Sequence, residues 1–188
     1  PKGLNVTIPY KKEVIPFLDN LSKEAETIKA VNTIVWDANG KTIGHNTDHT
    51  GFEKSLYEKI EKKPKKALIL GTGGASGAIE FVLNKMDCAF RHVSRNPKEN
   101  QFSYDQLSKK HLDKVDLIVN TTPLGTFPDT KQAPPIPYKY INSKHFLFDL
   151  IYNPKETRFL KEGRLRGAKT SNGYKMLVYQ AEKSWKLW

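Results

Sequence analysis

Residues 67–77 read ALILGTGGASG and decide the fold. The continuous apolar run ALIL is typical of a buried strand, and glycines follow it at once. The next residues, AIEFVLNKM at 78–86, continue as a helix. A strand, a glycine-rich turn and a helix in this order are the context of a dinucleotide-binding fingerprint, because free N–H groups at a helix start bind a pyrophosphate.

The glycines have the spacing G-x-G-x-x-x-G instead of G-x-G-x-x-G, because Ser76 holds the third position. Glycine lets the backbone approach phosphates closely. A plain glycine turn is the simpler alternative, and the flanking strand and helix count against it. The turn residues predicted to bind a cofactor are Gly71, Thr72, Gly73, Gly74 and Ala75.

Strands and helices alternate after this turn. Further strands are expected at 88–96, 116–123 and 145–154, and helices at 103–112 and 155–167. This alternation predicts a parallel sheet with right-handed crossovers. The fold class is therefore α/β: a Rossmann-type domain over residues 51–172, plus part of a second α/β domain formed by residues 1–50 and 173–188.

The end of the second strand, Val93-Ser94-Arg95-Asn96, indicates which dinucleotide binds. NAD sites usually place an acid here for the ribose hydroxyls, whereas a 2′-phosphate repels a carboxylate and favours arginine. The stretch RHVSRN contains no acid. NADP is therefore favoured over NAD, with Ser94 and Arg95 at the phosphate, although Arg95 as a plain surface charge is the alternative.

The N-terminal part contains a short strand, a hairpin and a helix. Val6 and Ile8 alternate with polar residues, which predicts a half-buried strand over 5–8 that Pro9 ends. Lys11 then lies at a strand-to-helix corner, where a solvated lysine is the ordinary interpretation. An amphipathic stretch follows at 11–28. The Asn-Gly centre of DANGK predicts a hairpin that pairs 31–36 with 41–45.

Two helices complete this part. Asn46, Thr47 and Asp48 are cap residues for a helix over 49–62, in which apolar side chains recur every four residues. Residues 174–188 form a closing amphipathic helix. His45 and His49, with Asp48 between them, are the nearest approach to a metal motif, and no metal is predicted.

Composition excludes several classes of protein. None of the apolar runs in the 188 residues approaches the roughly 18 that a membrane span needs, so a soluble cytoplasmic protein with no membrane partner is expected. The single cysteine, Cys88, excludes an internal disulfide and suggests a small buried residue. The formal charge of +11 suits anionic ligands. The basic block at 58–66 has no interleaved aromatics, so nucleic acid is not the predicted partner.

Seven segments, in order and spacing, give the chain a resemblance to the shikimate dehydrogenase family. They are GLNVTIPYKK, AVNT, HNTDHTGF, GTGGASGAI, VNTTPLG, DLIYNP and SNGYKMLVYQAE. The resemblance implies an enzyme that reduces 3-dehydroshikimate to shikimate with NADPH, in aromatic amino acid (chorismate) biosynthesis.

The resemblance also implies roles for individual residues. Lys11 is the catalytic residue and works with Asp48; an ammonium group can stabilise and protonate the alkoxide that hydride transfer creates. A helix N-cap is a compatible role for Asp48. The remaining implied residues are Thr7, Asn32, Tyr152 and Gln180 at the substrate, and Thr121, Pro123 and Gly173 at the cofactor.

The sequence departs from the family pattern in three places, one of which is Ser94-Arg95-Asn96, where Asn-Arg-Thr is common. No Ser-x-Ser segment for the substrate carboxylate precedes Pro1, so an N-terminal segment is expected to be lacking and activity to be impaired. Gly77 also stands where many relatives carry arginine. Two other functions stay open: a quinate/shikimate dehydrogenase that uses NAD, and an NADP-binding module without catalysis. A monomer and a homodimer are both compatible with the sequence.

Overall fold

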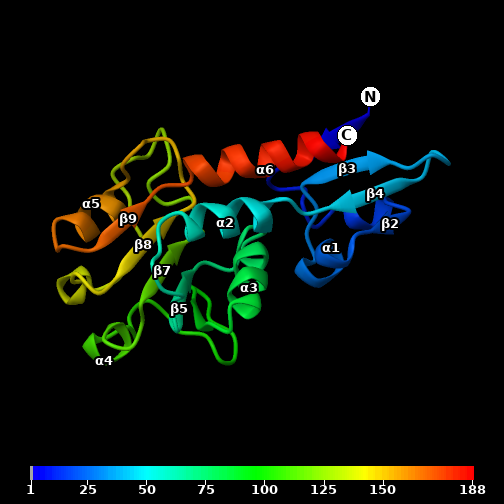
Figure 1. The fold of residues 1–188 in the computed structure, drawn as a ribbon. Helices are drawn as coiled ribbons and strands as arrows, with labels where there is room; N and C mark the ends of the chain where they lie inside the picture. Colours follow the sequence, from blue (N-terminus) through cyan, green and yellow to red (C-terminus); the bar gives the residue numbers. More distant parts are fainter. Residues whose placement is uncertain (1) are drawn as a thin grey trace. The chain divides into compact units, whose positions relative to one another are not determined.

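The structure is a computed structural model that describes residues 2–188, and these residues form two compact units (Figure 1). Unit 1 comprises the described residues up to Glu58, together with Gly74–Val82 and Lys175–Trp188. Unit 2 comprises Lys59–Gly73 and Leu83–Tyr174. The expected domain limits, 1–50 with 173–188 and 51–172, stay a prediction.

Unit 1 contains a four-stranded sheet within the described residues, in the order β1-β3-β4-β2 (Figure 1). Its strands are β1 (Gly3–Asn5), β2 (Asn20–Leu21), β3 (Thr33–Trp36) and β4 (Thr42–His45). β3 pairs antiparallel with β4, with Thr33 opposite His45 and Trp36 opposite Thr42. The predicted hairpin is therefore confirmed. Gly40 in its turn has φ +76°, a conformation that glycine adopts without strain.

The predicted strand over residues 5–8 is wrong. β1 ends at Asn5, although the Val6 N–H still donates to Asn32 O at 2.8 Å. The chain then turns away from the sheet, and Ile8 is 75% exposed. Two alternating apolar residues were too short a pattern to define a strand. Lys11 consequently lies in a run of turns before the 3₁₀ helix η1 (Ile15–Phe17), not at a strand-to-helix corner.

The helices of unit 1 are shorter than their sequence patterns. In the amphipathic stretch 11–28, the α-helical part is α1 (Lys23–Ile28), which the Ser22 side chain caps. The helix expected over 49–62 is α2 (Asp48–Tyr57), in which Phe52 and Leu56 are fully buried. The closing helix is α6 (Tyr174–Leu187), as predicted.

Gly51 brings α2 and α6 close together. A Cβ added to Gly51 would lie 2.5 Å from Met176 O and 3.0 Å from Gln180 Cβ. Both distances are shorter than ordinary contact, so a residue without a side chain is needed. The close approach places the start of α2, with Asp48, near Gln180 of α6.

Unit 2 contains a fully parallel sheet in the order β6-β5-β7-β8-β9. Its strands are β5 (Lys66–Leu70), β6 (Ala89–Val93), β7 (Leu117–Asn120), β8 (Phe146–Asp149) and β9 (Lys169–Ser171). The predicted parallel sheet is confirmed, and the short edge strand β9 is an addition to it. β6 and β7 lie on opposite sides of β5. The strand order therefore reverses at β5, and ligands of open α/β sheets bind at the carboxyl ends of strands at such a point.

The helices that connect these strands differ in how well the sequence predicts them. α3 (Ser76–Lys85) follows the glycine turn as expected. The helix expected over 103–112 is one turn, α4 (Lys109–Leu112), because Ser108 and His111 form a capping box that starts it late. The helix expected over 155–167 is α5 (Arg158–Arg164), with Thr157 as its N-cap. A 3₁₀ helix, η2 (Tyr138–Tyr140), precedes β8.

Each unit has its own apolar core. Unit 1 has one cluster around Ala25, Val31 and Ile34, and another around Ile28, Ala30 and Ala78. The larger core of unit 2 includes Leu68, Leu70, Ile118, Leu147 and Phe159. Among residues 2–188, no helix combines the length and apolar character that crossing a membrane requires.

Cys88 is buried, as its apolar surroundings in the sequence predict. Burial raises the pKa of its thiol to about 11. The thiol therefore stays protonated near neutral pH and is a poor nucleophile.

Candidate active site

Lys11 and Asp48 form a largely buried ion pair in unit 1. Lys11 Nζ lies 2.5 Å from Asp48 Oδ2, and the two side chains are 14% and 8% exposed. The Lys11 carbonyl accepts the Val31 N–H at 2.7 Å, which anchors the turn that carries the lysine. A buried pair of charges is stable only where further hydrogen bonds complete it.

Asn32 supplies the further hydrogen bond to the carboxylate. Its Nδ2 donates to Asp48 Oδ1 at 3.0 Å and to Thr47 Oγ1 at 2.9 Å, while its Oδ1 accepts the Thr47 N–H at 2.7 Å. The backbone donor fixes which end of the amide is the oxygen. Both carboxylate oxygens of Asp48 are therefore engaged, one by Asn32 and one by Lys11.

Gln180 on α6 joins the same group. Its Oε1 lies 3.2 Å from Asn32 Nδ2, across a sequence separation of 148 residues. Asp48 is the first residue of α2, and Thr47 is the N-cap. A carboxylate in the first helical turn is stabilised by the helix dipole. The structure thus brings four predicted residues together: Lys11, Asn32, Asp48 and Gln180.

The other two predicted substrate residues lie elsewhere. Thr7 is exposed in the turn after β1, and its carbonyl accepts the Tyr10 N–H. Tyr152 is 50% exposed and follows β8 in unit 2. The structure does not group either of them with the buried cluster, and their substrate roles stay predictions.

The predicted cofactor turn begins at the carboxyl end of β5. Gly71 has φ +106°, and a Cβ added to it would lie 2.8 Å from Thr121 Oγ1. Thr121, directly after β7, donates to Leu70 O from both its N–H and its hydroxyl. Gly71 and Thr121 therefore meet at the point where the strand order reverses.

The space around the turn fits a phosphate group. A Cβ added to Gly73 would meet nothing within 4 Å, so there is space beside its Cα. A Cβ added to Gly74 would lie 3.9 Å from Lys11 Cβ, and both of these residues belong to unit 1. Thr72 and Ala75 are neighbours in the same turn. These residues fit the dinucleotide that the sequence predicts.

Ser94 and Arg95 follow β6 directly. Arg95 is exposed, and no carboxylate in residues 2–188 forms an ion pair with it. The Ser94 hydroxyl accepts the Asn96 N–H at 3.2 Å. An arginine at this sheet edge that forms no ion pair with the described carboxylates fits a 2′-phosphate.

The remaining predicted cofactor residues are Pro123 and Gly173. Pro123 is exposed in the loop after β7, where its carbonyl accepts the Thr126 N–H. Gly173 is buried, and an added Cβ would lie 2.0 Å from Leu150 O. The chain's own backbone therefore requires this glycine. The cofactor roles of both residues stay predictions.

Asp149 of the DLIYNP segment has a structural role. It is fully buried and accepts hydrogen bonds from Thr157 Oγ1 at 2.6 Å, Asn120 Nδ2 at 3.0 Å and Ile151 N–H at 3.0 Å. Burial raises the pKa of its carboxyl to about 6, although these hydrogen bonds lower it. The carboxylate links the carboxyl ends of β7 and β8 to the start of α5.

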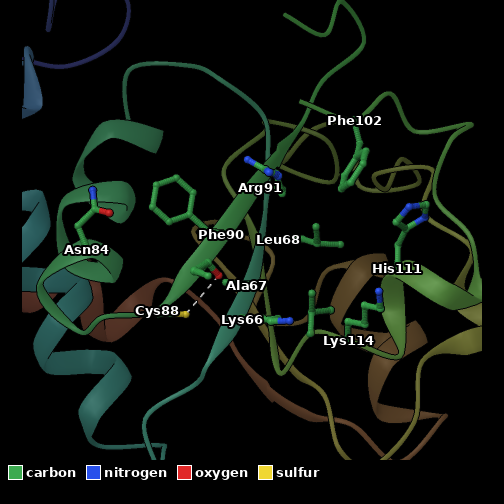
Figure 2. Close-up of a pocket in the computed structure, with 12 residues that line it drawn as sticks. Lys66, Ala67, Leu68, Asn84, Cys88, Phe90, Arg91, Phe102, His111 and Lys114 are labelled. Atoms are coloured by element: carbon green, nitrogen blue, oxygen red, sulfur yellow. Dashed lines mark hydrogen bonds between the residues drawn. The ribbon is translucent and has the colours of Figure 1, made fainter. Parts of the chain in front are cut away.

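Unit 2 also has a surface hollow of about 630 Å³ that the sequence does not predict. Figure 2 shows Arg91 and Leu68 on one side of it, with Phe102, His111 and Lys114 opposite. None of the predicted site residues lines it. The cofactor turn and this hollow are therefore separate features.

His45 and His49 give no metal centre in the part of the chain that the structure describes. No group of three or more His, Cys, Asp or Glu side chains there could hold a metal ion. The His49 ring instead lies edge-on to Phe81, with 5.0 Å between ring centroids.

A glycine turn at the switch point of a parallel sheet and a buried lysine–carboxylate pair are the features expected of a nicotinamide-dependent oxidoreductase of the α/β class. The family described as "Shikimate dehydrogenase substrate binding domain" matches residues 1–34. The NADP(+)-dependent shikimate dehydrogenase of Methanococcus maripaludis is 42% identical over 202 aligned residues, which cover 100% of this chain and 72% of that protein. The chain belongs to the shikimate dehydrogenase family.

Solved structures agree with this assignment. A shikimate dehydrogenase from Thermus thermophilus, in complex with NADP(H) and shikimate, matches with a TM-score of 0.87 and 32% identity, over 100% of this chain and 72% of that one. A quinate dehydrogenase from Corynebacterium glutamicum in complex with NAD matches with a TM-score of 0.87 and 29% identity, over 99% and 72%. The same fold therefore serves more than one substrate and cofactor.

The sequence missed three residues of the buried cluster: Thr33, Thr47 and Ser184. Thr33 and Thr47 stand beside named residues in AVNT and HNTD, and that adjacency is the signal that could have found them. Ser184 has no such signal, because its partner Thr33 is 151 residues away.

Proposed function

We propose that this chain catalyses the NADPH-dependent reduction of 3-dehydroshikimate to shikimate, in aromatic amino acid biosynthesis in the cytoplasm. The observation that carries the proposal is the buried Lys11–Asp48 pair, completed by Asn32. The family assignment supports it, since curated relatives are NADP(+)-dependent shikimate dehydrogenases.

Lys11 acts as the proton donor. When bound, NADPH supplies the hydride that adds to the carbonyl carbon of the substrate. Lys11 Nζ donates a hydrogen bond to the carbonyl oxygen and transfers a proton to it as negative charge develops there. Solvent can then return a proton to Lys11, since its side chain is 14% exposed.

Asp48 orients the lysine and binds a substrate hydroxyl. Its Oδ2 holds Lys11 Nζ, and its Oδ1 is held by Asn32, so the carboxylate is fixed before substrate arrives. Such preorganisation spares the site a rearrangement during the reaction. Further contacts to the substrate are assigned to Thr7, Asn32, Tyr152 and Gln180.

Residues at the carboxyl ends of the parallel strands would hold the cofactor. The pyrophosphate is assigned to the turn from Gly71 through Ala75, and the 2′-phosphate to Ser94 and Arg95. The nicotinamide side is assigned to Thr121, Pro123 and Gly173. Residues 51–172 are accordingly proposed as the NADP-binding domain, and residues 1–50 with 173–188 as the substrate domain.

The test is an absorbance assay at the reduced-nicotinamide band. We expect shikimate to drive a slow but measurable reduction of NADP⁺ by the purified chain, and the signal to be absent with Lys11→Ala. If no substrate produces a signal while calorimetry still detects NADP⁺ binding, the chain is a binding module and the proposed reaction is wrong.

A second candidate is quinate oxidation with NAD, because a quinate dehydrogenase in complex with NAD shares the fold. The end of β6 argues against NAD, since the residues 93–96 contain no acid to bind the ribose hydroxyls. Running the same assay with quinate and NAD⁺ separates the two candidates. A higher kcat/KM for quinate with NAD⁺ would favour the second.

A further inference from the structure

Ser184 is a buried hydroxyl that joins three segments of unit 1. It lies on α6, one turn after Gln180, and is 0% exposed. Its Oγ lies 2.7 Å from Thr33 Oγ1 on β3 and 3.0 Å from Thr47 Oγ1 at the start of α2. It also donates to the Gln180 carbonyl at 3.0 Å. A serine that only satisfied its own helix would not need the two threonines.

One assignment of the protons gives these hydrogen bonds a single direction. Ser184 has one hydroxyl proton, which goes to the Gln180 carbonyl, so its Oγ accepts from Thr33 and Thr47. Thr47 Oγ1 in turn accepts from Asn32 Nδ2 at 2.9 Å. The chain of donors therefore runs from Asn32 through Thr47 and Ser184 to the Gln180 carbonyl.

Removing the Ser184 hydroxyl would leave both threonine protons to find other acceptors. The nearest are Asn32 Oδ1, at 3.3 Å from Thr47 Oγ1 and 3.2 Å from Thr33 Oγ1, and Gln180 Oε1, at 3.4 Å from Thr47 Oγ1. Both acceptors belong to the amides beside Asp48. Because buried groups avoid staying unpaired, the threonines would turn toward these amides and disturb them.

We propose that Ser184 is a positioning residue for the Lys11–Asp48 pair. It holds the Thr47 hydroxyl as an acceptor for Asn32, which keeps Asn32 Nδ2 directed at Asp48 Oδ1. It also ties the turn of α6 that carries Gln180 to β3 and α2. This role rests on the proposed function, since it acts through the residues assigned to the reaction.

The kinetic test compares Ser184→Ala with Ser55→Ala. Ser55 is also a buried serine of unit 1, but its hydroxyl bonds only Phe52 O of its own helix, at 3.0 Å. We expect Ser184→Ala to lower kcat/KM for shikimate roughly tenfold, the worth of about one buried hydrogen bond, with the Kd of NADP⁺ unchanged. Ser55→Ala should stay within about twofold of the unmutated chain. An equal loss in the two variants would reduce Ser184 to a general stability role and overturn the proposal.

A second set of variants tests the chain of donors at Thr47. Thr47→Ser keeps the hydroxyl and should retain most of the activity, whereas Thr47→Val should lose about as much as Ser184→Ala. The double variant of Ser184→Ala and Thr47→Val should lose little more than either one, because both break the same chain. Fully multiplicative losses would mean that the two residues act independently, which would overturn the chain of donors.

An activity-independent readout keeps this proposal separate from the proposed function. The side-chain amide proton signals of Asn32, followed by NMR in the unliganded chain, should shift in Ser184→Ala and stay in place in Ser55→Ala. If the unmutated chain turns over no shikimate, the proposed function fails while this measurement still decides the role of Ser184. Unchanged Asn32 signals in Ser184→Ala would overturn it.

Discussion

The proposed sites of unit 1 and unit 2 consist of different chemical groups. In unit 2 the proposed cofactor site consists largely of backbone at strand ends, where Gly71 and Thr121 meet beside β5 and β7. In unit 1 the proposed reacting groups are charged side chains from separate segments, held by buried amides and hydroxyls. A site made of backbone groups depends on glycine at the positions where a side chain would not fit. A site made of buried charges depends on each partner, because removing one leaves the other unpaired.

The largest effect is expected at the charge pair of unit 1. Lys11→Ala should lower kcat by a factor of about 100 to 10,000, the usual contribution of a positioned proton donor. The Kd of NADP⁺, measured by calorimetry, should change little. Lys12→Ala, at the exposed neighbouring position, is the control. A Lys11→Ala enzyme within a few-fold of the unmutated kcat would remove the lysine from proton transfer.

Unit 2 contains a buried charge of its own at Asp149, and it should show in the pH dependence of stability. With a pKa raised to about 6 when folded and about 3.9 when unfolded, the folded chain binds more protons between these values. The free energy of unfolding should therefore fall as pH rises from about 4 to about 6, by on the order of 2 to 3 kcal/mol.

Urea unfolding across this pH range measures that effect. Asp149→Asn should remove this part of the pH dependence, and the exposed Glu99→Gln should leave it intact. Identical slopes in Asp149→Asn and the unmutated chain would show that the carboxyl does not titrate in this window.

Substituting Arg95 tests whether a charged side chain also contributes to dinucleotide binding by unit 2. Arg95→Ala should weaken NADP⁺ binding by about 1.5 to 3 kcal/mol, or roughly tenfold to a hundredfold, while NAD⁺ binding stays the same. Arg91→Ala is a matched control, since Arg91 lies on β6, four residues before Arg95, and lines the separate hollow (Figure 2). Equal affinities of the unmutated chain for the two dinucleotides would remove Arg95 from this role.

The smallest effect concerns backbone packing in unit 1. Gly51→Ala places a Cβ 2.5 Å from Met176 O and should force α2 and α6 apart. We expect a net loss of about 1 to 2 kcal/mol in the free energy of unfolding, because the better helix propensity of alanine offsets only part of the strain. The KM for shikimate should rise as Gln180 moves. A more stable Gly51→Ala chain with an unchanged KM would show that the close approach is not needed.

The sequence by itself determined the features that depend on neighbours along the chain. The parallel sheet, the glycine turn after β5, the hairpin of β3 and β4 and the arginine after β6 all follow from short local patterns. The resemblance of seven segments to one family added Lys11, Asn32, Asp48 and Gln180, which no local pattern would have joined. Helix ends were predicted less well, because capping by Ser108 or Thr157 is a matter of single hydrogen bonds.

Only the tertiary structure decided the rest. It placed Lys11 in a turn instead of at a strand end, gave Asp149 a structural role, and brought Ser184 to Thr33 and Thr47. These features depend on which polar groups become buried together and must then satisfy one another. Such partners lie up to 151 residues apart in the chain but 2.7 Å apart in space. Neither periodicity nor motif spacing therefore indicates them.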